Sequence, residues 1–199
     1  MKPTSQTNRS SAKSRRVLSL APLLAALGLL LAATHPLRAA EPFQSGQGWV
    51  TVELGGGQVD RSTPGFSDNS SRFYLGFEGG VALNAHVLLG AEFSGWLVQS
   101  GNLQDGTKGS GISQVFAVTR IYPQADSAFH LQLGGGSLKG WDNSPNGSSH
   151  SGSGWEVGLG YDRMIGTHSA ITPFLRYSSG RAGSLKLSAV TVGVGFTWR

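Results

Sequence analysis

Eight charged residues are the first candidates for chemistry in this chain, because each lies in a segment where apolar and polar residues alternate. Such a spacing places charged side chains and small residues on one face of an extended segment. Buried carboxylates and guanidinium groups must be paired, so they could form a structural ion-pair network, or they could line a path for ions or protons. We predict the structural network inside a common interior. Its members are Glu53, Arg72, Glu78, Glu92, Arg120, Glu156, Asp162 and Arg176.

Two further patterns could bind ligands, and the sequence favours neither. The segment 142–150 offers Asp, Asn and His ligands, but its spacing matches no calcium-binding loop. The glycine triplets at 55–57 and 134–136 are followed by neither a helix nor the Lys-Ser/Thr of a phosphate-binding loop. We interpret them as strand bends or bulges. Since the chain also lacks cysteine, thiolate metal sites and disulfides are excluded. We predict no catalytic, cofactor-binding or metal site and no cofactor.

The elements that would position these charges are strands with two unlike faces. The alternation of apolar and polar residues has the two-residue period of a β-strand. In the fourth segment either Val115 or Phe116 could face outward, and we prefer Val115 because this choice turns Gln114 and Arg120 inward. The segments are 49–54, 72–83, 89–97, 112–122, 129–133, 155–162, 171–177 and 190–198.

The connections between these segments alternate in length. Longer ones, rich in Gly, Ser, Asn and Asp as loops are, are expected at 60–71, 99–111 and 142–153. Shorter ones are expected at 84–85, 123–127 and 163–169, and the last, 178–184, is intermediate. An even number of strands with short turns at one end and longer loops at the other is typical of transmembrane barrels.

The two faces of the strands distinguish a membrane barrel from a soluble one. The polar face combines charges with glycines, which suits a narrow interior, and the apolar face ends in aromatic residues like those of interfacial girdles. We therefore predict an all-β fold, an eight-stranded antiparallel up-and-down transmembrane β-barrel, with a soluble barrel as the alternative. The expected girdle residues are Trp49, Trp96, Phe129, Trp155, Tyr161, Tyr177, Phe196 and Trp198.

Residues 1–40 have the pattern of a secretory signal peptide. Basic residues precede an apolar run from Val17 to Ala33, and small residues follow, so we expect cleavage after Ala39 or Ala40. Residues 41–199 would then form the barrel domain. The leader holds six of the sixteen Lys and Arg residues and none of the eleven acids, so the mature chain has a net charge of 10 − 11 = −1. This charge removes the support for nucleic-acid binding.

The last strand resembles the C-terminal assembly signal of outer-membrane barrels through Thr191, Gly193, Phe196 and Trp198, although Arg199 follows the final aromatic residue. Together with the leader and the eight segments, it makes the mature chain similar to the small outer-membrane β-barrel superfamily typified by OmpA, OmpX and OmpW. The resemblance implies the outer membrane of a Gram-negative bacterium and a monomeric barrel. The implied partners are outer-membrane lipid, lipopolysaccharide, the outer-membrane assembly machinery and periplasmic chaperones.

Three functions are compatible with this reading. The first is a non-enzymatic barrel with a structural, envelope-integrity or surface-interaction role, as in OmpX-like barrels. The second is a narrow channel for small apolar or amphipathic molecules, as in OmpW-like barrels. The third is a lipid A-modifying hydrolase, since Arg176-Tyr177-Ser178 looks like the His-x-Ser segment of lipid A deacylase barrels. Arginine replaces the histidine and cannot act as the base that a hydroxyl nucleophile needs, although His150 could fold over Ser178. We expect no enzymatic activity.

Overall fold

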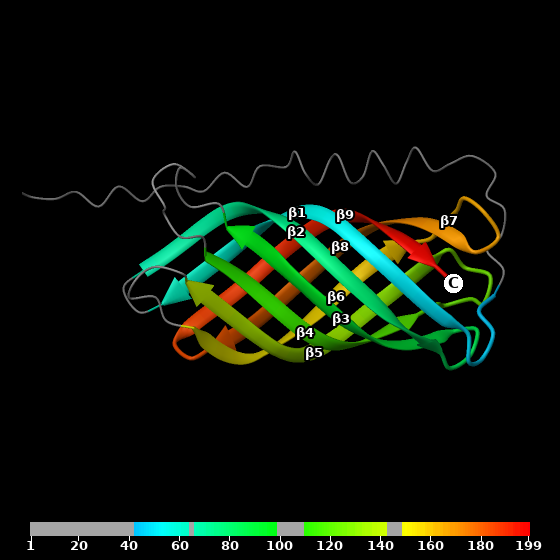
Figure 1. Ribbon diagram of the computed structural model, residues 1–199, viewed down its shortest axis with the longest axis horizontal. Coiled ribbons are helices and arrows are strands. Elements are labelled where there is room, and N and C mark those ends of the chain that lie inside the picture. Colours follow the sequence, from blue (N-terminus) through cyan, green and yellow to red (C-terminus); the bar gives the residue numbers. More distant parts are fainter. Residues whose placement is uncertain (1–41, 64–65, 99–109, 143–148) are drawn as a thin grey trace, which may run out of the picture.

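The computed structural model describes residues 42–63, 66–98, 110–142 and 149–199. These residues form an elongated β-barrel (Figure 1). Among them, no helix is long and apolar enough to span a membrane. The strands are β1 (Gly48–Thr63), β2 (Phe66–Ala82), β3 (Val87–Val98), β4 (Ser110–Ile121), β5 (Phe129–Asp142), β6 (His150–Tyr161), β7 (Arg163–Met164), β8 (Ser169–Ala182) and β9 (Leu185–Trp198).

Every long strand pairs with two neighbours, so the sheet closes on itself. The order is β6-β5-β4-β3-β2-β1-β9-β8, and β6 also pairs with β8. All of these pairs are antiparallel, and the two-residue β7 only extends the edge of β8. The eight long strands confirm the predicted up-and-down barrel. A closed barrel leaves no sheet edge with unpaired backbone groups, which is the condition for a sheet to lie in lipid.

The two ends of the barrel differ. The connections 83–86, 122–128 and 162–168 lie at the turn end, where the chain also terminates (Figure 1). The opposite end, called the loop end here, carries the pair Thr63 and Phe66 and the tight turn at Gly183. Gly183 has a φ of +61°, a left-handed conformation that glycine adopts without the steric cost other residues have. That turn joins β8 and β9 with only two residues outside the strands.

The alternation of side chains confirms the predicted facings. Outward side chains are apolar and exposed, such as Leu133 at 43%, whereas the inward Glu53 is only 1% exposed. On β4, Val115 faces outward, and Phe116 and Arg120 are buried inside, as preferred from the sequence. The exterior is therefore apolar and the middle section of the interior is polar, which is the reverse of the arrangement in a soluble globular protein.

The strands at the loop end are longer than the sequence predicted. Within the expected loop 60–71, residues 60–63 and 66–71 are paired strand, with Arg61 opposite Asp68, and most of 178–184 belongs to the β8–β9 hairpin. Parts of the other two expected loops are also strand, namely Ser110–Gly111, Asp142 and His150–Ser153. Residues 99–109 and 143–148 of those loops, and the expected signal peptide, lie outside the described residues. A strand that projects beyond lipid can be polar on both faces, so its composition resembles that of a loop.

The structure corrects two other expectations, one in full and one in part. Trp49 and Trp96 are 2% and 1% exposed and lie inside the barrel, not in a girdle, because each is an even number of residues from inward-facing glutamates. Of the two interpretations of the glycine triplets, bends or bulges, the structure excludes bulges, because the register of β1 with β2 and β9, and of β5 with β4 and β6, continues through them without a shift. Gly55 instead allows close strand contact, because a Cβ there would lie 2.5 Å from the Val192 carbonyl oxygen.

Replacing Leu133 with Arg should destabilise the barrel in a bilayer by about 2 to 4 kcal/mol, because it puts a charge on the lipid face near mid-belt. The matched control is Ser137→Arg, four residues nearer the loop end on the same outward face of β5, where the partner on β6 is the exposed Ser153. Urea unfolding in lipid vesicles measures both. Equal tolerance of the two arginines would contradict the position of the apolar belt.

Candidate functional site in the barrel interior

Arg176 on β8 is the centre of a buried group of charges. Its Nη1 donates to Glu92 at 2.8 Å and to the hydroxyl of Tyr74 at 2.6 Å, and its Nη2 donates to Glu53 at 3.0 Å. The Tyr74 hydroxyl in turn donates to Glu53 at 2.9 Å. One guanidinium thus joins strands β1, β2, β3 and β8 across the lumen, and its charge-assisted hydrogen bonds are of the strong kind.

Arg120 on β4 makes the second set of contacts. Its Nε and Nη2 donate to the two oxygens of Glu78 at 3.1 and 2.7 Å, the bidentate geometry that suits a planar guanidinium. Its Nη2 also donates to Thr51 at 3.2 Å, and its guanidinium lies 4.3 Å from the ring centroid of Trp49. The ring supplies favourable cation–π contact on a side where water is excluded.

Two glutamines contribute neutral donors to the same group. The amide nitrogens of Gln114 and Gln132 each donate to both Glu92 and Glu156, at 3.1 to 3.2 Å. This charge cluster has four glutamates but only two guanidinium groups. The amide N–H groups therefore supply additional hydrogen-bond donors to the carboxylate oxygens. The charge cluster consists of Glu53, Glu78, Glu92, Glu156, Arg120 and Arg176, all of which are buried.

Asp162 forms a separate polar centre nearer the turn end. It accepts hydrogen bonds from Tyr122 at 2.6 Å and Thr172 at 2.7 Å, and His130 Nδ1 lies 3.7 Å away. A row of hydroxyls, Thr172, Thr197 and Thr51, then connects Asp162 with Arg120. These hydroxyls complete the polar interior with short, uncharged side chains.

Apolar side chains close the lumen on both sides of the charge cluster. The loop-side apolar cluster consists of Val59, Tyr74, Trp96, Ile112, Leu138, Phe174, Ala182, Leu187 and Ala189. The turn-side aromatic cluster consists of Phe43, Trp49, Ala82, Leu88 and Tyr122. The alternating pattern predicted a single polar inward face, and these two apolar layers were not predicted. They could have been predicted from large apolar residues at positions that the alternation turns inward, namely Val59, Trp96 and Leu138.

The structure brings most of the predicted interior charges together, but not all. The four glutamates, Arg120 and Arg176 meet in the charge cluster, and Asp162 joins them through threonines. Arg72 also faces inward, but it lies nearer the loop end, opposite Gly57, and is only half-buried. Tyr74, Gln114 and Gln132 donate hydrogen bonds to glutamates of the charge cluster, and the sequence did not single them out as members of the network.

The residues of the expected C-terminal signal occupy both faces of β9. Phe196 and Trp198 face outward and are exposed, whereas Thr191 is buried and accepts a 3.3 Å hydrogen bond from the Trp96 indole. Gly193 leaves room for the ring of Phe174, which a Cβ would meet at 2.6 Å. The strand therefore has structural roles in addition to the predicted recognition role, which stays a prediction.

The carboxylates of Glu53, Glu78 and Glu92 offer ligand atoms within 4.8 Å of one another, a spacing that could hold a metal ion. However, all three accept hydrogen bonds from Arg120 or Arg176. A divalent cation would have to displace these guanidinium groups, so the geometry fits an ion-pair network better than a metal site.

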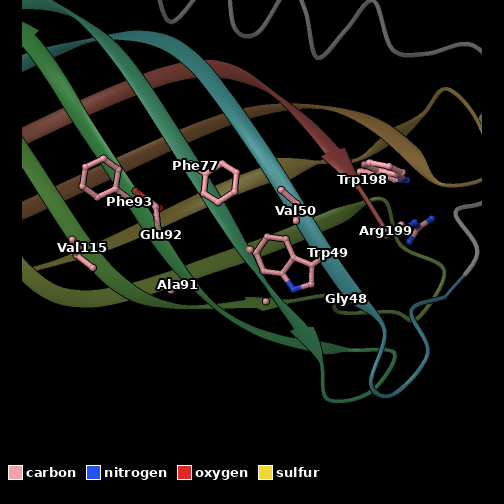
Figure 2. Close-up of a pocket in the computed structure, with 12 residues that line it drawn as sticks. Gly48, Trp49, Val50, Phe77, Ala91, Glu92, Phe93, Val115, Trp198 and Arg199 are labelled. Carbon is pink, nitrogen blue, oxygen red and sulfur yellow. The ribbon is translucent and has the colours of Figure 1, made fainter.

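The barrel also has a hollow of about 660 Å³, but on its outer face near the turn end. Figure 2 shows Val50, Phe77, Phe93 and Val115 around it, with Trp198 at one side. Its floor includes Gly79 and Ala91, whose small size creates the depression. Because the surface of this hollow is almost entirely apolar, we assign the hollow to the apolar exterior and not to the lumen.

Together, the closed sheet, apolar exterior and filled polar interior define a small β-barrel of the outer-membrane type. No known protein-family model matches the chain, and no curated protein matches it either. Among solved structures, the chain is similar to Ail of Yersinia pestis, with 16% identity and a TM-score of 0.51 over 76% of this chain and 99% of Ail. It is also similar to Neisserial surface protein A, with 12% identity and a TM-score of 0.55 over 76% of this chain and 96% of that protein. The resemblance to the small outer-membrane barrels is thus confirmed at the level of the fold.

Proposed function

We infer that the chain is a non-enzymatic, non-conducting barrel of a Gram-negative outer membrane, which supports the envelope or presents its loop end to partners. The observation that carries this proposal is the sequence of three buried layers across the lumen: the loop-side apolar cluster, the charge cluster and the turn-side aromatic cluster. Eight strands enclose only enough space for side chains, and here large side chains fill it. Ail, an attachment invasion locus protein, has the same fold, which supports a role at the cell surface.

The positions of Ser178 and His150 argue against the hydrolase alternative. Ser178 points into the barrel, is 1% exposed and stands opposite Glu156 on β6. His150 is exposed and lies six residues before Glu156 on β6, about 20 Å along a strand. A nucleophile and its base must be within hydrogen-bond reach, so these two residues do not form a catalytic pair.

Planar-bilayer recording of the refolded barrel tests the proposal. We expect no step-like conductance from the native protein and no faster escape of a small amphipathic dye from proteoliposomes. The matched variant is Trp96→Ala with Leu138→Ala, which removes bulk from the loop-side apolar cluster and should allow leakage if that cluster contributes to the seal. Steps or dye escape with the native protein would favour the narrow channel instead.

The proposal also includes the factors that would deliver and insert the chain. By the resemblance of its last strand, the chain would reach the membrane through periplasmic chaperones and the outer-membrane assembly machinery, and it would act there as a monomer.

A further inference from the structure

The outer face of the barrel changes character toward the loop end. On β6 and β8 the outward residues Trp155 and Tyr177 contact each other, with ring centroids 5.6 Å apart. Beyond them the outward positions on β6, β8 and β9 are no longer apolar but are occupied by serines and by cations. Paired aromatic rings followed by a polar surface are typical of the boundary between hydrocarbon and headgroups.

Three cations lie in this polar zone: Arg181 and Lys186 on the paired strands β8 and β9, and Lys139 on β5, which β6 separates from β8. All three are exposed, and their inward neighbours Leu138, Ala182 and Leu187 are buried, so the cations face outward. We call these three residues the cationic collar.

The register places two of these cations directly against each other. Arg181 is the cross-strand partner of Lys186, and Ser153 on β6 is the partner of Arg181 on its other side. Lys139 is paired with Ser151, two residues from Ser153. Like charges directly opposite on an antiparallel pair are destabilising, and an anion between them would turn that repulsion into attraction. Asp60 also faces outward, on the adjacent strand β1, where its partner on β9 is Ser188, two residues from Lys186.

We propose that the cationic collar binds the phosphate groups of lipopolysaccharide, with its acyl chains along the apolar surface below Trp155 and Tyr177. This rests on the proposed function, because the loop end must face the outer leaflet. The three cations can form charge-assisted hydrogen bonds with the phosphates, and the hydroxyls of Ser151 and Ser153 can hydrogen-bond to sugar groups. The outward serines make a glycolipid a better fit than an ordinary phospholipid.

The test uses the full mature barrel, folded in zwitterionic detergent, with fluorescent lipopolysaccharide as the probe. Losing two basic residues should weaken binding about 30-fold at low salt, so we expect this loss for Arg181→Ser with Lys186→Ser. Arg163→Ser, an exposed cation at the turn end, is the matched control and should bind like the native barrel. Dephosphorylated lipopolysaccharide should bind the native barrel as weakly as the probe binds the double variant.

Thermal unfolding of the same samples separates binding from a structural role. Without lipid, the double variant should be as stable as the native barrel or slightly more stable, because a repulsion is removed. With lipopolysaccharide, only the native barrel and Arg163→Ser should gain stability. Native-like binding by the double variant, or equal binding of dephosphorylated lipopolysaccharide, would overturn the proposal. Equally tight binding of phosphatidylglycerol vesicles would replace the glycolipid by a phospholipid. None of these outcomes depends on whether the barrel conducts.

Discussion

Replacing Arg176 with Leu should destabilise the barrel by about 3 to 5 kcal/mol, because it leaves buried carboxylates without their counter-ion. The guanidinium is 2% exposed and contacts Glu53 at 3.0 Å and Glu92 at 2.8 Å, on two different strands. Urea titration in lipid vesicles, followed by tryptophan fluorescence and by mobility on unboiled gels, gives the change in unfolding midpoint.

Two further variants make this measurement specific. Arg163→Leu also removes a cation but at an exposed site, so its midpoint should stay close to that of the native barrel. Arg176→Lys keeps the charge but cannot reach Glu53, Glu92 and Tyr74 with a rigid fork of donors, so its midpoint should lie between the other two. A native midpoint for Arg176→Leu would show that water reaches the charge cluster.

Removing Phe196–Arg199 should abolish insertion into the outer membrane while leaving export intact, if the last strand carries the assembly signal. Removing Arg199 alone should have little effect on insertion. Its guanidinium lies 4.6 Å from the ring of Phe43, a contact that concerns packing at the turn end. Outer-membrane fractionation and the shift in mobility between unboiled and boiled samples measure the folded, inserted fraction.

The longer truncation also removes backbone pairs with β1 and β8, such as Phe196 with Val52 and with Ile171. A substitution variant separates recognition from pairing. Phe196→Ser with Trp198→Ser keeps every backbone pair and should still fail to insert. Phe73→Ser with Phe77→Ser is the matched control, since these aromatic residues on β2 also face outward and are about half exposed. Equal insertion of the two pairs of variants would mean that Phe196 and Trp198 are ordinary belt residues.

The alternation of residues along the sequence was sufficient to predict the number of long strands and the facing of most of their side chains. Successive side chains of a strand point to opposite sides, so the alternation around Glu53, Arg120 and Arg176 already placed them inside. The same rule would have placed Trp49 and Trp96 inside, but their aromatic character and position near strand ends suggested a girdle. For these two residues, the position in the alternating pattern predicted the facing better than the residue type did.

Tertiary structure alone decided which inward side chains meet. Arg176 contacts Tyr74 and Glu53, which are 102 and 123 residues away in sequence. Those contacts depend on the register of each strand pair and on closure between β6 and β8, and no local pattern encodes either of them. The division of the interior into a charge cluster between two apolar clusters has the same origin, because each layer collects single residues from many strands. The length of the strands at the loop end also depends on tertiary structure. Polar segments whose composition is typical of loops become strands there, because pairing with a neighbour satisfies their backbone hydrogen bonds.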